Sequence, residues 1–182
     1  MRVRRAFSGT VVGLDLSLTG SAACALPCPW DGKISKARQM PMAGYKLKDG
    51  ATVIDLCERI INIRDAILNF CKEVQARRVM IENYAFSAPG KITMLAELGG
   101  VVKLDLLENW GVAVEPIHAS SARKILLQNL PQKDSKLFTS VNVRRLGGQT
   151  KDWTVDQIDA FVVANAALAR SDATALSFPG EW

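Results

Sequence analysis

The feature that most constrains the fold is a short apolar run that ends in a carboxylate. Residues 10–16 read TVVGLDL, with Asp15 enclosed between Leu14 and Leu16. A β-branched run of this length is typical of a buried strand. Burying an unpaired carboxylate in such a strand costs on the order of several kcal/mol. Asp15 is therefore difficult to explain as a structural residue and is a candidate functional group.

The pattern of apolar residues predicts a mixed α/β fold. Runs at 20–26 and 33–40, separated by prolines and a turn, predict an antiparallel meander with the first strand. From Thr52 the apolar period becomes helical, and Thr52 with Asp55 resembles a capping box. We expect this helix to end near residue 75. Its apolar positions, predicted to form the buried face, are Val53, Cys57, Ile60, Ile61, Ile67, Leu68, Cys71 and Val74.

The remaining elements complete one central sheet. We expect strands at 79–82 and 112–116, helices at 91–109, 119–128, 134–145 and 155–170, and a flexible loop at 147–150. The chain has 182 residues and shows no repeat or linker, so a single domain over residues 1–182 is predicted. The expected architecture is α/β, with a central mixed five-stranded sheet flanked by helices.

The predicted helix at 91–109 is apolar almost all the way round. A helix with this pattern is buried on more than one side, which predicts contacts with its own core and with a second subunit. Gly99 and Gly100 lie in its middle. Each costs about 1 kcal/mol of helix propensity, so we expect another backbone to pack closely against them.

Composition excludes several classes of protein. Hydrophobic residues make up 48% of the chain and charged residues 23%, which excludes a disordered, collagen-like or disulfide-dense chain. The cysteines lack paired C-x-x-C spacing, so Cys24, Cys28, Cys57 and Cys71 are expected to be buried free thiols in a reducing compartment. Asp15 interrupts the candidate signal-peptide core, and no apolar stretch reaches membrane-spanning length. We expect a cytoplasmic protein, or one in the host cytoplasm if it is virus-encoded.

Three further carboxylates resemble Asp15 in their setting. Glu82 closes the buried-looking strand, and Asp156 and Asp159 lie one turn apart on one face of the last helix. If parallel strands end at one edge of the sheet near the start of this helix, all four acids meet there. Four carboxylates in one place repel each other strongly unless cations neutralise them. The sequence therefore predicts an acidic site that binds cations.

Structural explanations compete with this interpretation. The helix dipole and a capping box of Thr154 with Gln157 account for acids at the start of the last helix without any chemistry. His118 is expected to be a surface or capping residue rather than a ligand. Cys24 and Cys28 lack the second pair of ligands that zinc needs.

The chemistry of the four acids favours magnesium. Hard oxygen ligands without nearby cysteine or histidine suit Mg²⁺, with Mn²⁺ as a substitute. Two such ions suggest phosphodiester hydrolysis, in which one activates a water and the other stabilises the leaving 3′-oxygen. The net charge of +5 favours an anionic partner. The basic pairs that could contact phosphates are Arg77–Arg78, Arg144–Arg145 and Arg123–Lys124, the last being the pair we assign to DNA.

Together these motifs resemble the RuvC family of Holliday junction resolvases, which have a ribonuclease-H-like fold. The resemblance rests on GLDLSLTG at 13–20, Ile81–Glu82, and DQIDA at 156–160, and it covers residues 9–170. It implies that Asp15, Glu82, Asp156 and Asp159 are both the catalytic acids and the metal ligands. It also implies a homodimer that joins through the helix at 91–109 and places two active sites on a four-way DNA junction.

The same resemblance implies residues that bind DNA. The family has an aromatic residue just after the glutamate strand, for which Tyr84 and Phe86 are the candidates. Basic residues ahead of the last helices contact the scissile phosphate, and Lys133 and Lys136 are the candidates for this role. Ser17, in the turn after the first strand, is a candidate for a contact with phosphate.

The predicted function is a Mg²⁺-dependent, structure-selective endonuclease that resolves four-way junctions by paired symmetric nicks. The alternatives are a broader nuclease for flaps and forks and a non-catalytic junction-binding protein of the same fold. Actin-like ATPases and sugar kinases open with a similar strand, but they need a second such domain, for which 182 residues leave no room. We expect neither a nucleotide cofactor nor a membrane partner.

Overall fold

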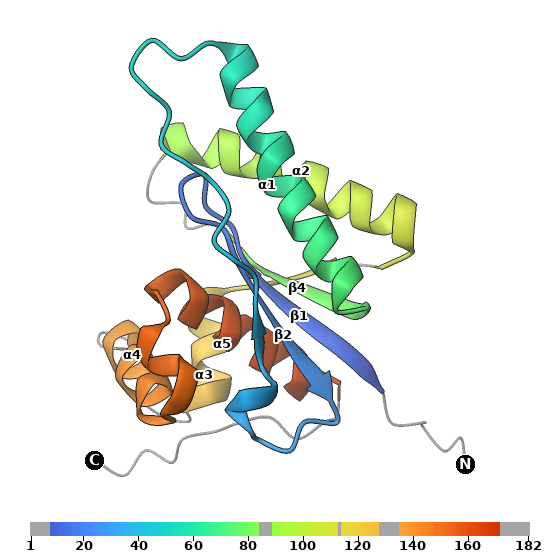
Figure 1. Cartoon of the computed structure of the whole chain (residues 1–182), viewed down its shortest axis with the longest axis vertical. Helices are drawn as coiled ribbons and strands as arrows, with labels where there is room; N and C mark the ends of the chain where they lie inside the picture. The colour runs from blue at the N-terminus through green and yellow to red at the C-terminus, as the bar shows by residue number, and fades with distance from the viewer. Residues whose placement is uncertain (1–7, 84–88, 113, 128–134, 172–182) are drawn as a thin grey trace.

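The structure, a computed structural model, describes residues 8–83, 89–112, 114–127 and 135–171 (Figure 1). A five-stranded sheet lies at its centre, in the order β3-β2-β1-β4-β5. The strands pair antiparallel from β3 to β1 and parallel from β1 to β5. Their bounds are β1 Gly9–Asp15, β2 Ala22–Cys28, β3 Arg38–Gln39, β4 Ala76–Glu82 and β5 Val114–Ile117. The predicted mixed five-stranded sheet is confirmed.

Helices cover both faces of the sheet. Figure 1 shows α1 and α2 on one side and α3, α4 and α5 on the other. The helices are α1 Val53–Glu73, α2 Pro89–Trp110, α3 Ala119–Leu127, α4 Ser135–Arg145 and α5 Val155–Ala169, with short 3₁₀ helices η1 Ile34–Lys36 and η3 Gly148–Asp152. None of the helices in the described ranges is long and apolar enough to cross a membrane.

Two predicted segments differ from the structure and contact each other. The expected third strand is reduced to β3, because residues 34–36 form η1 instead, and the expected flexible loop at 147–150 forms most of η3. Gln149 of η3 donates hydrogen bonds from Nε2 to the carbonyl oxygens of Ile34 (2.8 Å) and Ala37 (2.9 Å). The Thr150 hydroxyl is buried and donates to the Gly147 carbonyl at 2.8 Å. These bonds order both segments outside the sheet.

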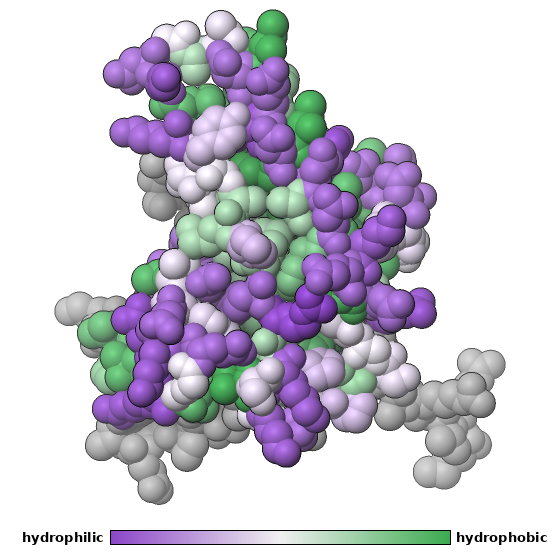
Figure 2. Space-filling model, viewed as in Figure 1, coloured by the Kyte–Doolittle hydropathy of each residue, from purple (hydrophilic) through white to green (hydrophobic). Residues whose placement is uncertain are grey.

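The buried face of α1 also differs from the prediction. The capping box at Thr52 is present, but Val53 is 75% exposed and Ile61 is exposed as well. Figures 1 and 2 show that the helix begins well beyond the sheet and that apolar residues lie on the surface at that end. The first turns of α1 therefore have no core to cover. The residues that α1 buries are Arg59, Ile60, Ile63, Ile67, Phe70 and Cys71.

The cysteines largely follow the expectation. All four are free thiols, and Cys24, Cys28 and Cys71 are buried. Cys57 is exposed, because it lies in the same protruding part of α1. The prediction of a buried thiol was wrong at this position.

Side chains alternate across the sheet and form two separate cores. Val12 and Leu14 of β1 pack with α1 and α2, whereas Val11 packs with α3 and α5. The period of two in a strand places Gly13 and Asp15 on the same side as Val11. Because Gly13 has no Cβ, α5 approaches β1 very closely at this point. A Cβ at Gly13 would lie 2.2 Å from the backbone nitrogen of Ala164.

This contact predicts that Gly13→Ala destabilises the protein. The added methyl would also lie 2.3 Å from the carbonyl oxygen of Ala160, so α5 has to move away from the sheet. We expect the free energy of unfolding to fall by about 1–3 kcal/mol or more, measured from urea unfolding in dilute solution. Gly100→Ala is the control, because a Cβ there meets nothing within 4 Å. An unchanged urea midpoint for Gly13→Ala would contradict this account of the packing.

Candidate active site

Two of the four predicted acids end neighbouring parallel strands. β1 and β4 pair through Leu14 and Ile81, so the next residues, Asp15 and Glu82, end their strands side by side. Met80 packs in the same core as α5, and Glu82, two residues later, lies on that same face of the sheet. Both carboxylates are half-buried. The structure thus places them together beneath the start of α5.

The other two acids come from the start of α5. Thr154 caps this helix: its hydroxyl accepts a hydrogen bond from the backbone nitrogen of Gln157 (3.2 Å), and the Gln157 side chain accepts one from the backbone nitrogen of Thr154 (3.0 Å). Asp156 lies in the first turn, and Asp159 follows with only 5% of its surface exposed. The cap and the close packing at Gly13 fix where the helix begins, and so where both acids lie.

Burial and mutual repulsion raise the pKa of three of these carboxyl groups. Burial is the main cause that raises the pKa of Asp15 to about 8, and the negative charges of the other three acids add to it. Burial, followed by the charge of Asp159, raises the pKa of Glu82 and that of Asp156 as well. The positive charge of Lys136 opposes the shift in all three. Near neutral pH the cluster therefore favours binding either a proton or a further cation.

Two basic side chains bind the fourth acid. Arg123 of α3 contacts Asp159 Oδ1 through Nη2 at 3.0 Å, and Lys136 of α4 contacts Oδ2 through Nζ at 3.3 Å. The Arg123 side chain is 13% exposed, whereas that of Lys136 is 61% exposed. The buried Arg123 Nε has no hydrogen-bond partner. Two of the four basic residues that the sequence assigns to DNA, Arg123 and Lys136, thus lie at the acids, one buried and one able to reach solvent.

The donor set fits a hard divalent cation. The side chains that face one another are carboxylates, the ligands that Mg²⁺ prefers, and they carry more negative charge than the two basic residues offset. In the described ranges, no three His, Cys, Asp or Glu side chains converge closely enough to hold an ion as they stand. Repulsion keeps uncompensated carboxylates apart, and both oxygens of Asp159 are engaged by cations. Binding a divalent ion would relieve the repulsion among Asp15, Glu82 and Asp156.

The remaining predicted residues have different settings. The Ser17 hydroxyl lies in the turn directly after β1, 3.2 Å from that of Thr19. Lys124 is exposed on α3. Tyr84, Phe86 and Lys133 lie outside the described residues, so their roles stay predictions.

One residue in each of the other two basic pairs contributes to the fold. Arg78 of β4 pairs with Glu115 of β5 at 3.1 Å. Arg144 of α4 donates a hydrogen bond to the carbonyl oxygen of Trp153 at 3.4 Å. These contacts favour a structural role for Arg78 and Arg144.

Sequence reasoning missed two residues near the site. Gly13 was part of the motif, but only the structure shows how closely α5 approaches it. Arg59 is only 6% exposed, although arginine is rarely buried. One signal was available: Arg59 precedes Ile63, Ile67 and Phe70 at the helical spacing of the buried stripe.

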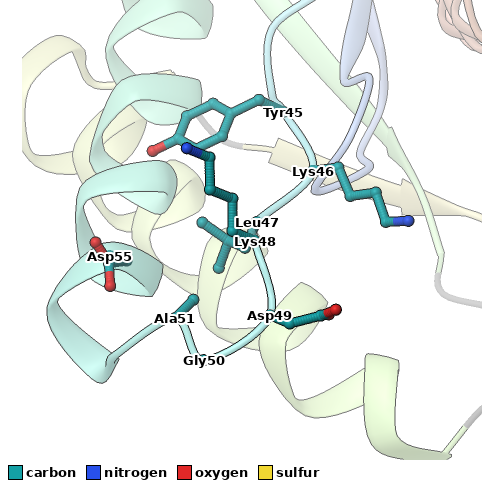
Figure 3. Close-up of a pocket in the computed structure, with 8 residues that line it drawn as sticks. All are labelled: Tyr45, Lys46, Leu47, Lys48, Asp49, Gly50, Ala51 and Asp55. Atoms are coloured by element: carbon teal, nitrogen blue, oxygen red, sulfur yellow. The ribbon is translucent and has the colours of Figure 1, made fainter.

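A separate pocket lies away from the acids. It has a volume of about 380 Å³ and is formed by residues 45–51 together with Asp55. Figure 3 shows Lys46 and Asp49 pointing away from Tyr45 and Asp55. Its polar groups therefore do not all face one centre, and Asp55 is held in the capping box with Thr52. The acid cluster is therefore the stronger candidate for an active site.

Comparison with known proteins identifies the fold. No protein-family model matches the sequence, and no protein with a curated description matches it either. RuvC of Thermus thermophilus matches 91% of this chain and 98% of its own, with a TM-score of 0.68 and 19% identity. T. thermophilus RuvC in complex with Holliday junction substrate matches 89% of this chain and 95% of its own, with a TM-score of 0.62 and 17% identity.

A third structure is more distant. The yeast mitochondrial Holliday junction resolvase Ydc2 matches 86% of this chain and 76% of its own, with a TM-score of 0.50 and 10% identity. The order of strands, the flanking helices and these similarities agree. The chain has the ribonuclease-H-like fold of RuvC, as the resemblance implied.

The raised pKa of Asp15 predicts an unusual dependence of stability on pH. In metal-free protein the folded state keeps a proton on Asp15 between about pH 4, where an unfolded aspartate loses it, and about 8. Stability therefore falls as pH rises through this range, by up to about 1.4 kcal/mol per pH unit from this group. Asp15→Asn should flatten the dependence of the urea midpoint on pH, and Asp49→Asn, at an exposed site, should not. Equal slopes for wild type and Asp15→Asn would contradict the assignment.

Proposed function

We propose that this chain is a Mg²⁺-dependent endonuclease that resolves four-way DNA junctions by paired symmetric nicks. The observation that carries the proposal is the cluster of four carboxylates at the ends of β1 and β4 and the start of α5, on the fold of RuvC. A protein that only bound DNA would gain affinity from neutral or basic residues at these positions. The acids therefore favour cleavage over binding alone.

The four acids and the two basic residues have different roles in the proposed mechanism. Asp15, Glu82, Asp156 and Asp159 would hold two Mg²⁺ ions, which when bound supply the positive charge that phosphodiester hydrolysis requires. Arg123 keeps Asp159 oriented from a buried position. Lys136, whose side chain is 61% exposed, can leave Asp159 and donate a hydrogen bond to an oxygen of the scissile phosphate. The four acids, Arg123 and Lys136 thus form one functional cluster.

Branched DNA is the substrate that these features favour. The net charge is +5 even though the site itself is acidic, so the surface elsewhere is basic. One of the structures of the same fold is RuvC in complex with Holliday junction substrate. Shape selectivity of this kind needs two active sites held at a fixed distance, and hence a second subunit.

Helix α2 has the surface that a homodimer requires. Leu98, Val102 and Leu106 are fully buried and form one stripe toward the core. On the opposite side, at spacings of four and three residues, lie Gly100, Leu104 and Leu107. Leu104 is 54% exposed and Leu107 57% exposed. We infer that this second stripe packs against the same helix of another subunit, with Gly100 at the point of closest approach.

The first test is cleavage of a synthetic immobile four-way junction, with linear duplex and a flap as control substrates. We expect paired symmetric nicks that require Mg²⁺ or Mn²⁺. Asp15→Asn should reduce the cleavage rate by more than about 100-fold while junction binding stays the same or becomes tighter, because one negative charge is removed. Asp49→Asn is the matched control.

Each other outcome has a definite meaning. Binding without cleavage by the wild type would favour a junction-binding protein, and equal cleavage of flaps and junctions would favour a general debranching nuclease. Cleavage by Asp15→Asn at the wild-type rate would remove these acids from the mechanism.

A substitution at Gly100 tests the proposed dimer. A side chain at this position meets nothing within 4 Å in one subunit, so Gly100→Leu should leave the monomer folded and raise its helix propensity by about 1 kcal/mol. It should nevertheless block the close approach of a second helix. We expect a dimer for wild type and a monomer for Gly100→Leu by light scattering. Val53→Lys, at another exposed apolar position, should remain dimeric, and a dimeric Gly100→Leu would exclude this part of α2.

A further inference from the structure

A small pocket lies beside the acids, on the other face of β1. It has a volume of about 220 Å³ and is lined by the turn at 16–19, by Arg59 of α1, and by Met94 and Leu95 of α2. The turn starts one residue after Asp15, so the pocket and the acid cluster lie at the same end of β1. In Figure 1 the turn lies next to α2, on the side of the sheet away from α5.

The charged group of this pocket, Arg59, is buried, and none of the described carboxylates pairs with it. Its side chain is 6% exposed. Nη1 donates a hydrogen bond to the carbonyl oxygen of Tyr45 at 3.2 Å, and Nε has no partner. Within the described part of the chain, no carboxylate forms an ion pair with it. A guanidinium has five N–H donors, and burying it unpaired is costly, so an anion in the pocket would be stabilising.

The other polar groups of the pocket are hydroxyls. Ser17 Oγ and Thr19 Oγ1 lie 3.2 Å apart at its edge and are exposed to solvent. Ser21 holds the backbone of the turn in place: its hydroxyl donates to the Ser17 carbonyl (2.6 Å) and accepts from the Ser17 backbone nitrogen (3.0 Å). An arginine and two hydroxyls with no acid among them have the chemistry that binds phosphate oxygens.

We propose that this pocket, the Arg59 pocket, binds a backbone phosphate of the cleaved DNA strand, next to the scissile phosphate. The inference rests on the proposed function, because it assumes that DNA crosses the end of β1. A strand held at the acids on one face of β1 reaches the pocket on the other face by crossing the turn at 16–19. Arg59 is then a positioning residue that sets which phosphate lies at the acids.

The salt dependence of binding tests the charge of the pocket. Junction affinity is measured without divalent ions over a range of salt concentrations. Arg59→Gln should weaken binding about 10-fold or more and lower the slope of log affinity against log salt by about one, the loss of a single phosphate contact. The matched control is Arg64→Gln on the same helix, because Arg64 pairs with Asp65 and Asp105. An unchanged slope for Arg59→Gln would overturn the proposal.

A neutral phosphate identifies the position that is bound. Junctions carry one methylphosphonate at each position flanking the scissile phosphate. At one of these positions the methylphosphonate should weaken junction binding by wild type as much as the Arg59→Gln substitution does. At the same position it should not weaken binding by Arg59→Gln any further, which is expected when the two altered groups contact each other. If every position weakens both proteins equally, Arg59 contacts no flanking phosphate and the proposal fails.

Two further measurements keep the test clear. Because Arg59 is buried, the thermal midpoint of each variant is recorded. If Arg59→Gln is unfolded, Thr19→Ala takes its place: its hydroxyl is exposed, and it should show a smaller loss confined to the same methylphosphonate position. Equal losses at all positions would then overturn the proposal. Failure of wild type to bind junctions would instead contradict the proposed function, so the two failures are distinguishable.

Discussion

The close contact between α5 and β1 at Gly13 is the constraint on which the site depends. A strand and a helix can approach this closely only where no side chain separates them, and a Cβ at Gly13 would collide with the backbone of α5. Asp15 lies two residues after this contact, and Asp159 precedes Ala160, one of the contacting residues, directly. Backbone packing therefore sets the distance between acids that come from opposite ends of the sequence.

Bringing the acids together opposes the stability of the fold. Repulsion and burial raise the pKa of three of the carboxyl groups, and only Asp159 is fully paired, with Arg123 and Lys136. The apolar packing on both faces of β1 offsets the free-energy cost of this unfavourable charge. Such a site has a preference for cations, which a divalent ion can satisfy.

Most of the fold and the four acids could be predicted from local signals. Alternating and helical periods locate β1, β4 and α5, and an acid at the end of an apolar strand is visible in the sequence alone. The third strand and the loop at 147–150 could not be predicted, because Gln149 joins them through hydrogen bonds across more than a hundred residues. The exposure of Val53 depends on where the sheet ends beneath α1, and no local sequence pattern predicts that position.

Arg59 shows why prediction from local sequence patterns fails near functional sites. Helical spacing places position 59 on the buried stripe of α1, where an apolar residue would give the more stable helix packing. The guanidinium is there nonetheless, next to the turn that follows Asp15 and without a carboxylate partner among the described residues. A buried charge that no described carboxylate neutralises points to a partner that the protein binds. For the Arg59 guanidinium at the end of β1, that partner is an anion.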